Sequence, residues 1–402
     1  MISRICYTDY IIIIWLNMND NSYISRYYEN LNPYCQPGKV LIIFGARQVG
    51  KTTLLKHFLS AYSGRYKLDS GDNIATQTML AMANFQTIAA YVENYTLIVI
   101  DEAQKIPNIG QCLKIMVDQH PHLRIIATGS SSFELAGQVG EPLTGRKQTL
   151  ILYPLAHLEL LTQYNALELK QQLQAYLIYG SYPAVITAQA IHEKRDIIIE
   201  IAHSYLLKDI LALDKVKNPK ILLDLLRLLA FQVGNEVSHA ELAKQLGIDT
   251  KTVARYLDLL EKGFVLYNLR GFSRNLRKEI TKKSKYYFYD NGIRNALIAN
   301  FNPLNLRDDI GKLWENFLFI ERLKKRNYLS IHANDYFWRT WDKKEIDLIE
   351  ERAGQLYGYE FKWGDKIPHA PKDWLETYHH ANYTVINQDN YLPFISETSE
   401  FD

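Results

Sequence analysis

The chain has 402 residues, of which 47% are hydrophobic and 22% are charged, and its formal net charge is +2. This length is too great for one compact core and predicts two to four domains, while the composition excludes a largely disordered chain. The nearly neutral charge confines any nucleic-acid-binding surface to a local patch. Three scattered cysteines, Cys6, Cys35 and Cys112, exclude a disulfide framework or a zinc knuckle and predict a cytoplasmic protein.

An isoleucine-rich stretch, residues 10–16, lies near the start of the chain. It is shorter than the roughly 20 residues that a membrane span requires. No small-residue cleavage site follows it, so neither a membrane anchor nor a signal peptide is predicted. Met18 comes directly after this stretch. The sequence therefore predicts that residues 1–23 are an N-terminal extension and that translation starts at Met18.

The most specific motif is Gly-Ala-Arg-Gln-Val-Gly-Lys-Thr at residues 45–52, which fits the phosphate-binding loop pattern G-x-x-x-x-G-K-[ST]. An apolar strand-like run, Val40–Phe44, precedes it and a helical segment follows. Glycines let the backbone curl so that its N–H groups point at phosphates, and the helix N-terminus adds positive charge. We expect Lys51 to reach the β- and γ-phosphates and Thr52 to bind Mg²⁺. The residues predicted to hold the nucleotide are Gly45, Ala46, Arg47, Gln48, Val49, Gly50, Lys51, Thr52 and Thr53.

A second apolar run, Leu97–Ile100, ends in Asp101 and Glu102, which is typical of a buried parallel strand. A right-handed crossover can bring the end of this strand beside the loop. Asp101 is then predicted to hold the metal through water. Glu102 points differently and is predicted to polarise the water that attacks the γ-phosphate.

Two further residues are candidates for the same site. Ser130 follows the strand-like run 123–127, where it either senses the γ-phosphate or caps a helix near Phe133. Arg146 precedes the apolar run 150–152, where it acts either as an arginine finger, in cis or from a neighbouring subunit, or as a surface residue. The sequence leaves both pairs of alternatives open.

Alternating strand and helix patterns predict that residues 24–155 form a nucleotide-binding core around a parallel sheet. The expected strands lie near residues 40–44, 65–69, 97–100, 123–127 and 149–152. Residues 156–234 have helical periodicity instead, which predicts a helical lid or linker.

Residues 235–292 carry a helix-turn-helix pattern. Ser238 and Glu241 have capping-box spacing, Gly247 opens a short turn, and residues 250–260 form a second amphipathic segment. Two strand-like runs then bracket a basic segment, so we predict a winged helix with a basic wing. The predicted DNA contacts are Lys251, Arg255, Arg274, Arg277, Lys282 and Lys283, and Lys285 belongs to the same basic segment. The alternative is a module that binds a protein partner.

The last hundred residues hold two strand-like runs, 346–349 and 356–362, around a turn-like segment. A hairpin that pairs Glu350 with Gln355 divides the side chains between two faces. The polar face holds Asp347, Glu360 and Lys362, and the apolar face holds Ile346, Leu348, Tyr357, Tyr359 and Phe361. With Glu315 as a third carboxylate, the polar face has the groups to bind Mg²⁺ and attack a phosphodiester. The alternative is the ordinary polar face of an amphipathic hairpin.

In their order along the chain, these motifs resemble a family of prokaryotic AAA-type ATPases. Its members join an ATPase core to a winged helix and to a C-terminal domain of unknown function related to PD-(D/E)xK nucleases. The likeness rests on residues 45–55, 100–104, 128–132, 143–146, 180–183, 285–292, 314–317, 345–347 and 360–362.

The resemblance implies an α/β fold: a P-loop NTPase sheet with a helical lid, a winged helix, and a restriction-endonuclease-like domain over residues 300–402. It implies ATP and Mg²⁺ as cofactors and the roles given above to Lys51, Thr52, Asp101 and Glu102. Glu315, Asp347, Glu360 and Lys362 match the nuclease pattern, and the first three would be metal ligands.

The leading hypothesis is a cytoplasmic ATPase whose nucleotide state moves a DNA-associated C-terminal half. One alternative is a metal-dependent DNA nuclease for which the ATPase acts as a loader. Another is an ATP-gated switch that binds a protein partner. The sequence does not decide the oligomeric state or the physiological substrate.

Overall fold

The structure is a computed structural model that describes residues 23–130, 140, 142–205, 218–272, 284–340 and 344–397. Several predicted features lie outside the described residues. They are residues 1–22 of the N-terminal extension, the helix near Phe133, and the basic residues Arg274, Arg277, Lys282 and Lys283. None of the described helices is long and apolar enough to cross a membrane.

The predicted parallel sheet is confirmed in the first part of the chain. Its order is β2-β3-β4-β1-β5, and every neighbouring pair is parallel. The strands are β1 (Val40–Phe44), β2 (Tyr66–Ser70), β3 (Leu97–Asp101), β4 (Arg124–Gly129) and β5 (Lys147–Ile151). The helices around it are α2 (Lys51–Ser60), α3 (Ile74–Ala81), α4 (Phe85–Val92) and α5 (Ile109–Gln119), with a short 3₁₀ turn, η2 (Ala103–Lys105).

Both faces of this sheet are buried. Leu41 and Ile43 of β1 belong to one hydrophobic cluster, whereas Val40, Ile42 and Phe44 belong to another. A strand alternates its side chains between faces, so a continuous apolar run is what burial on both sides requires.

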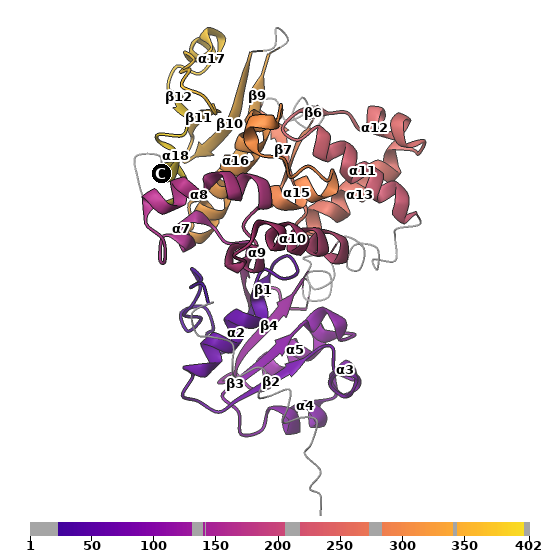
Figure 1. Cartoon of the computed structure of the whole chain (residues 1–402). Coiled ribbons are helices and arrows are strands. Elements are labelled where there is room, and N and C mark those ends of the chain that lie inside the picture. Colours follow the sequence, from indigo (N-terminus) through magenta and orange to yellow (C-terminus); the bar gives the residue numbers. More distant parts are fainter. Residues whose placement is uncertain are drawn as a thin grey trace, which may run out of the picture.

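A helical segment follows the sheet, and part of it lies between the sheet and the rest of the molecule (Figure 1). Its helices are α7 (His157–Leu160), α8 (Ala166–Tyr179), α9 (Pro183–Thr187), α10 (Ile191–Tyr205) and α11 (Pro219–Phe231). One hydrophobic cluster extends from β1 through this segment into the C-terminal half, with Leu41, Leu173, Leu225 and Leu348 among its members. The helical segment is therefore packed on both sides.

The segment predicted as a winged helix contains β6 (Glu236–Val237), α12 (His239–Leu246), α13 (Thr250–Lys262), β7 (Leu266–Gly271) and β8 (Ser284–Phe288). The hydroxyl of Ser238 accepts a hydrogen bond from the backbone N–H of Glu241 and so caps α12. Gly247 ends that helix in the left-handed region, with φ 65°. Asp249 caps α13 by accepting from the N–H of Thr252.

The remaining elements are α15 (Asn291–Leu297), η4 (Leu304–Leu306), α16 (Ile310–Tyr328), β9 (Asn334–Arg339), β10 (Glu345–Arg352), β11 (Gln355–Phe361), α17 (Lys372–Thr377), β12 (Asn382–Ile386) and α18 (Tyr391–Ser396). The C-terminal strands form one seven-stranded sheet with those of the preceding segment, in the order β12-β11-β10-β9-β7-β8-β6. The link is a parallel pairing of β7 with β9, with Gly271 opposite Phe337. The sequence predicted two separate units here, and this long-range pairing joins them.

The β10–β11 hairpin corrects the predicted register. Arg352 pairs with Gln355 and Glu350 pairs with Tyr357, so the register is shifted by two residues. The cause is a two-residue turn, Ala353-Gly354, in which both residues have positive φ, the requirement of the tight hairpin turn. An even shift leaves the alternation of faces intact.

A second correction concerns the faces themselves. A β-bulge separates Ile346 from Ile349 in the pairing with β9. Ile346 therefore joins Ile349 and Trp374 in a cluster distinct from the one that holds Leu348 and Tyr359. Both faces of the hairpin are covered by hydrophobic clusters, whereas the sequence predicted one apolar and one polar face.

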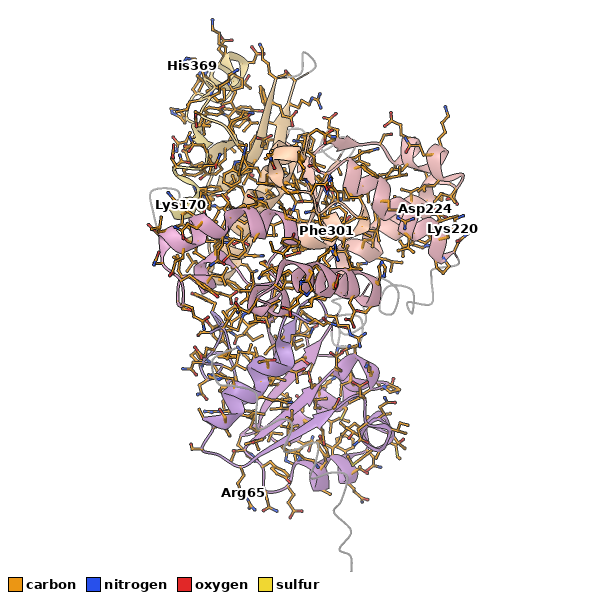
Figure 2. All side chains as sticks on the ribbon, viewed as in Figure 1. Arg65, Lys170, Lys220, Asp224, Phe301 and His369 are labelled. Atoms are coloured by element: carbon orange, nitrogen blue, oxygen red, sulfur yellow. The ribbon has the colours of Figure 1, made fainter. Side chains whose placement is uncertain are left out.

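The molecule is elongated, and its two ends serve as landmarks in Figure 2. Arg65 lies at the outer end of the first sheet, and His369 lies at the far tip of the C-terminal half. The nucleotide loop, between β1 and α2, is on the side of the first sheet that faces the helical segment (Figure 1).

Candidate nucleotide site

The loop between β1 and α2 has the geometry that its glycines permit. A Cβ on Gly45 would lie 2.1 Å from the carbonyl oxygen of Leu152, so no larger residue fits there. Gly50 has φ 97° and starts α2 from the left-handed region. Arg47, Gln48 and Val49 complete the turn.

The side chain of Lys51 folds back over this loop. Its ammonium donates to the carbonyl oxygens of Gly45 at 2.8 Å and Ala46 at 2.9 Å. Lys51 is buried, while Thr52 and Thr53 are exposed on the first turn of α2. A positive charge therefore lies at the loop, beside the helix N-terminus that attracts anions.

The end of β3 brings a carboxylate to the same place. The hydroxyl of Thr52 donates to Oδ2 of Asp101 at 2.7 Å, and the hydroxyl of Thr128 donates to the other carboxylate oxygen. Asp101 is buried. A hydroxyl and a carboxylate this close are hard oxygen donors of the kind that Mg²⁺ prefers, so these residues fit the magnesium ion of an Mg–nucleotide complex.

Glu102 is turned out of the strand direction. Its φ is 51°, in the left-handed region that non-glycine residues seldom adopt, and its N–H donates to the Thr128 hydroxyl at 3.1 Å. The amide of Gln104 donates to Oε2 of Glu102 at 2.6 Å and to the hydroxyl of Ser130 at 3.1 Å. Gln104 thus fixes the position of the Glu102 carboxylate relative to the end of β4.

Arg146 lies at the other end of the sheet. It precedes β5, its carbonyl accepts from the N–H of Val40, and its guanidinium donates to Asp118 at 2.8 Å. Val40 is the first residue of β1, and the loop follows the last. The length of β1, five residues at about 3.3 Å each, separates Arg146 from the loop of its own chain. Arg146 could therefore act as an arginine finger only at the loop of a neighbouring subunit.

Two of the three carboxylates predicted to form a nuclease centre, Glu315 and Asp347, pair with a buried lysine. The ammonium of Lys285 on β8 lies 3.4 Å from Glu315 and 4.0 Å from Asp347, and it also pairs with Glu345. Lys285 is 1% exposed. The sequence placed Lys285 in the basic segment of a predicted wing, and the structure buries it among acids.

The pKa values of these carboxyls follow from that environment. Burial, then repulsion from Glu315 and Glu360, raises the pKa of Asp347 well above its usual value, although Lys285 opposes the shift. Burial also acts to raise the pKa of Glu315, but Lys285, Lys312 and the Tyr287 hydroxyl outweigh it and lower that pKa.

This donor set does not fit the predicted metal. Lys285 already supplies the cation, Lys362 pairs with Glu360, and the N–H of Phe361 donates to Asp347 at 2.9 Å. In the part of the chain that the structure describes, no cluster of three or more acids, histidines or cysteines is arranged to hold a metal ion. The metal centre at Glu315, Asp347 and Glu360 therefore stays a prediction, and in this structure Lys285 forms ion pairs with two of its three carboxylates, Glu315 and Asp347.

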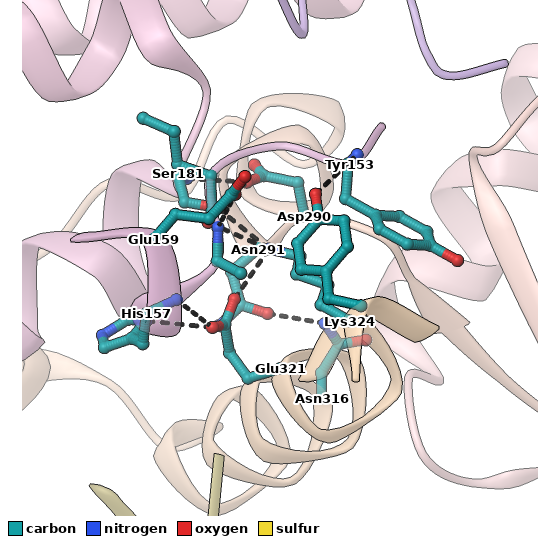
Figure 3. Close-up of polar contacts among 12 residues, drawn as sticks. Tyr153, His157, Glu159, Ser181, Asp290, Asn291, Asn316, Glu321 and Lys324 are labelled. Atoms are coloured by element: carbon teal, nitrogen blue, oxygen red, sulfur yellow. Dashed lines mark hydrogen bonds and ion pairs between the residues drawn. The ribbon is translucent and has the colours of Figure 1, made fainter. Parts of the chain in front are cut away.

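Three of the sequence motifs, residues 180–183, 285–292 and 314–317, meet at a buried junction that the sequence did not predict (Figure 3). Asp290 accepts from the N–H of Ser181 at 2.7 Å, and the amide of Asn316 donates to Asn291 at 2.7 Å. Glu321 accepts from the N–H of His157 at 2.7 Å and from Lys324 at 2.7 Å.

Two of these motifs contain a glycine at a position where the junction leaves no room for a side chain. A Cβ on Gly180 would lie 2.0 Å from Asp290, and one on Gly292 would lie 2.1 Å from the carbonyl oxygen of Tyr179. The junction joins the helical segment to α15 and α16, so these motifs have a structural role.

On the predicted DNA-binding helix, α13, Lys251 is exposed and Arg255 is half-buried. The guanidinium of Arg255 lies 5.3 Å from the ring centre of Tyr256. The hydroxyl of Thr252 donates to Asp249 and belongs to the helix cap. Lys251 is therefore the described basic residue most open to a ligand on this helix.

Sequence reasoning missed Arg26, which is buried and donates to the loop carbonyl of Val49 at 2.6 Å. It also missed Thr128 as the residue that holds both Asp101 and Glu102. A hydroxyl at the end of β4 was visible in the sequence, but a lone arginine ahead of the first strand gives no comparable signal.

Comparison with protein families matches residues 37–161 to an AAA domain. Two domains of unknown function follow, DUF8612 over residues 170–305 and DUF4143 over residues 310–398. An uncharacterised protein of Mycobacterium tuberculosis is 29% identical over 327 residues, which cover 80% of this chain and 70% of that protein. An uncharacterised protein of Haemophilus influenzae is 25% identical over 364 residues, with 83% and 85% covered.

Among solved structures, a signal transduction ATPase with numerous domains (STAND), from Pyrococcus horikoshii and with a tetratricopeptide repeat sensor, is 13% identical. The likeness covers 76% of this chain and 46% of that chain, at a TM-score of 0.29. The AAA match covers the loop, Asp101 and Glu102, where the geometry is that of a nucleotide site. Residues 37–161 therefore match an AAA domain and have a parallel five-stranded sheet that fits a P-loop nucleotide-binding fold, and the match implies that the protein binds ATP.

Proposed function

We propose that the protein is a Mg²⁺-dependent ATPase that hydrolyses ATP at the loop between β1 and α2. The observation that carries the proposal is the 2.7 Å hydrogen bond from Thr52 to Asp101, at the end of a loop over which the Lys51 ammonium folds back to the carbonyl oxygen of Gly45. It supports a single site that combines a phosphate-binding loop, a metal-binding pair and, one residue further, the Glu102 carboxylate.

Each residue has a defined task in this proposal. Lys51 stabilises negative charge on the β- and γ-phosphates, and backbone N–H groups of residues 45–50 bind the phosphate oxygens. Thr52 and Asp101 would hold a magnesium ion, which would neutralise charge on the phosphates. Glu102 orients the attacking water and accepts its proton, while Gln104 and Ser130 hold Glu102 in place. Arg146 of a neighbouring subunit would act only in an oligomer.

We further propose that α12, α13 and the β7–β8 hairpin form a winged helix that binds DNA and couples it to the ATPase. The element order and the capped helix pair support this assignment. The exposed Lys251 is the described residue best placed for a phosphate contact.

An ATP-gated switch that binds a protein partner is the second candidate. The pairing of β7 with β9 favours it, because that pairing fixes the hairpin in a sheet shared with the C-terminal half. A metal-dependent nuclease has less support, because two of its predicted metal ligands, Glu315 and Asp347, already pair with Lys285.

The test is steady-state ATP hydrolysis with Mg²⁺, with and without duplex and branched DNA, for the wild type and for Lys51→Ala. Stimulation by DNA that weakens steeply with rising salt, and weakens in Lys251→Glu, supports the DNA role. Turnover that DNA leaves unchanged supports the switch. Equal turnover in Lys51→Ala would refute the ATPase proposal itself.

A further inference from the structure

Arg26 lies in the segment before β1 and is 6% exposed, yet it belongs to no motif of the sequence. Its guanidinium donates to three groups that are far apart in the chain. Nη1 donates to the carbonyl oxygen of Val49 at 2.6 Å, Nη2 to that of Tyr153 at 2.7 Å, and Nε to the carboxylate of Glu159 at 2.9 Å. The planar fork of arginine can make these bonds together, which a lysine ammonium cannot.

The bond to Val49 acts on the loop itself. In a trans peptide the C=O and the following N–H point in opposite directions. A carbonyl held toward Arg26 therefore directs the N–H of Gly50 away from Arg26. Backbone N–H groups are what a phosphate-binding loop offers to its ligand, so Arg26 restrains the orientation of one such group. A Cβ on Gly50 would lie 3.6 Å from the Arg26 guanidinium, which shows how closely the two pack.

Glu159 holds Arg26 from the helical segment. Its carboxylate also accepts from the N–H of Tyr27 at 2.9 Å and from the N–H of Ala156 at 2.9 Å. The ion pair is buried on both sides, with side chains 4% and 0% exposed. A buried pair with each partner saturated by hydrogen bonds has one preferred arrangement.

The C-terminal half reaches the same guanidinium through Tyr328, near the end of α16. The Tyr328 hydroxyl lies 3.4 Å from Nη2 of Arg26 and accepts from the N–H of Tyr153 at 3.4 Å. Its ring stacks on that of Tyr27 at 5.2 Å. A shift of α16 would therefore move the group that restrains the loop.

We propose that Arg26 is a positioning residue for the nucleotide site, and that α16 acts on nucleotide affinity through the contact of Tyr328 with Arg26. This inference rests on the proposed function, since it needs a nucleotide at the loop. In this proposal the C-terminal half affects the nucleotide site through a single side chain, that of Arg26.

The experiment measures the Kd of a fluorescent ATP analogue with Mg²⁺, together with kcat and KM, for Arg26→Lys and Tyr328→Phe in the full chain. Arg26→Lys keeps the positive charge but cannot make the three guanidinium hydrogen bonds together. The Kd and KM should therefore rise about ten-fold or more, while kcat should change less than about three-fold. Tyr328→Phe keeps the ring packing and should raise the Kd by about two- to five-fold.

Arg322→Lys is the matched control. Arg322 also lies on α16 and is buried, but its partners are in the C-terminal half: it forms a two-pronged pair with Glu350 of β10 and donates to the carbonyl oxygen of Phe394 of α18. It should lower the melting temperature in the manner of Arg26→Lys and leave the nucleotide Kd unchanged. Where a variant is too unstable, Tyr328→Phe carries the test alone.

Wild-type affinity in Arg26→Lys and Tyr328→Phe would overturn the inference, as would an equal loss of affinity in Arg322→Lys. A folded wild type that binds no ATP analogue would instead overturn the proposed function. The two failures are therefore distinguishable.

Discussion

The hydroxyl of Thr52 donates a 2.7 Å hydrogen bond to Oδ2 of Asp101. The two residues are 49 positions apart and belong to different elements, the start of α2 and the end of β3. Parallel strands place their carboxyl ends at the same edge of a sheet, and ligands of α/β sheets bind at that edge. This one contact joins the phosphate-binding loop to the acidic strand.

Glu102→Gln should separate binding from hydrolysis. Glutamine keeps the size of the side chain and the contact with Gln104 but cannot accept a proton from water. We expect turnover to fall by about 10²-fold or more, because general-base catalysis supplies that order of acceleration. The Kd for an ATP analogue should stay within about three-fold of the wild type. Turnover close to that of the wild type would remove Glu102 from the mechanism.

Lys285→Met should destabilise the C-terminal sheet strongly. The substitution leaves Glu315 and Asp347 buried without their shared cation, a loss of about 3–5 kcal/mol for a buried charge pair. Urea unfolding of the wild type and the variant measures this loss of unfolding free energy. Lys312→Met is the control, because Lys312 also pairs with Glu315 but is 39% exposed, and should cost less than about 1 kcal/mol. Equal losses in the two variants would contradict the role given to Lys285.

Glu321 should make the protein sensitive to acid. Burial acts to raise its pKa, but Lys324 and His157 outweigh burial and lower the pKa from 4.5 to about 2. A lowered carboxyl pKa contributes stability above pH 4.5 that is lost as the pH falls toward 2, amounting to about 3 kcal/mol. The difference in unfolding free energy between the wild type and Glu321→Gln should therefore shrink below pH 4.5. A difference that stays constant from pH 7 to pH 3 would contradict this.

Gly292→Ala should disturb the buried junction. The new methyl group would meet the carbonyl oxygen of Tyr179 at 2.1 Å, and backbone cannot yield cheaply, so we expect a loss of about 2 kcal/mol or more. Gly311→Ala on α16 is the control, since a Cβ there meets nothing within 4 Å. Alanine is the better helix former, so Gly311→Ala should be neutral or stabilise by up to about 1 kcal/mol. Thermal unfolding of both variants checks the prediction.

The sequence was sufficient for the features that depend on local pattern. The motif at residues 45–52 functions only between a strand and a helix, so it predicts both. The continuous apolar runs of β1 and β3 predict strands that are buried on both faces, as in a parallel sheet. The strand positions were predicted to within a few residues. Topology rules then place Asp101 at the edge that carries the loop.

The features that the sequence did not reveal depend on contacts between distant residues. The pairing of β7 with β9 leaves no local pattern, so a continuous sheet could not be distinguished from two units. Lys285 has basic neighbours in the chain and acidic neighbours in space. The β10–β11 register depended on whether the turn had two residues or more, and the bulge beside Ile346 changed which face that residue joins.

The most direct test of the account is the rate of Mg²⁺-dependent ATP hydrolysis by the wild type and by Lys51→Ala, purified in parallel and matched in melting temperature. We predict measurable turnover in the wild type and a rate at background in Lys51→Ala, because the ammonium at Gly45 and Ala46 is lost from the phosphate site. Equal rates in the two proteins would contradict the assignment of this loop as the site of hydrolysis.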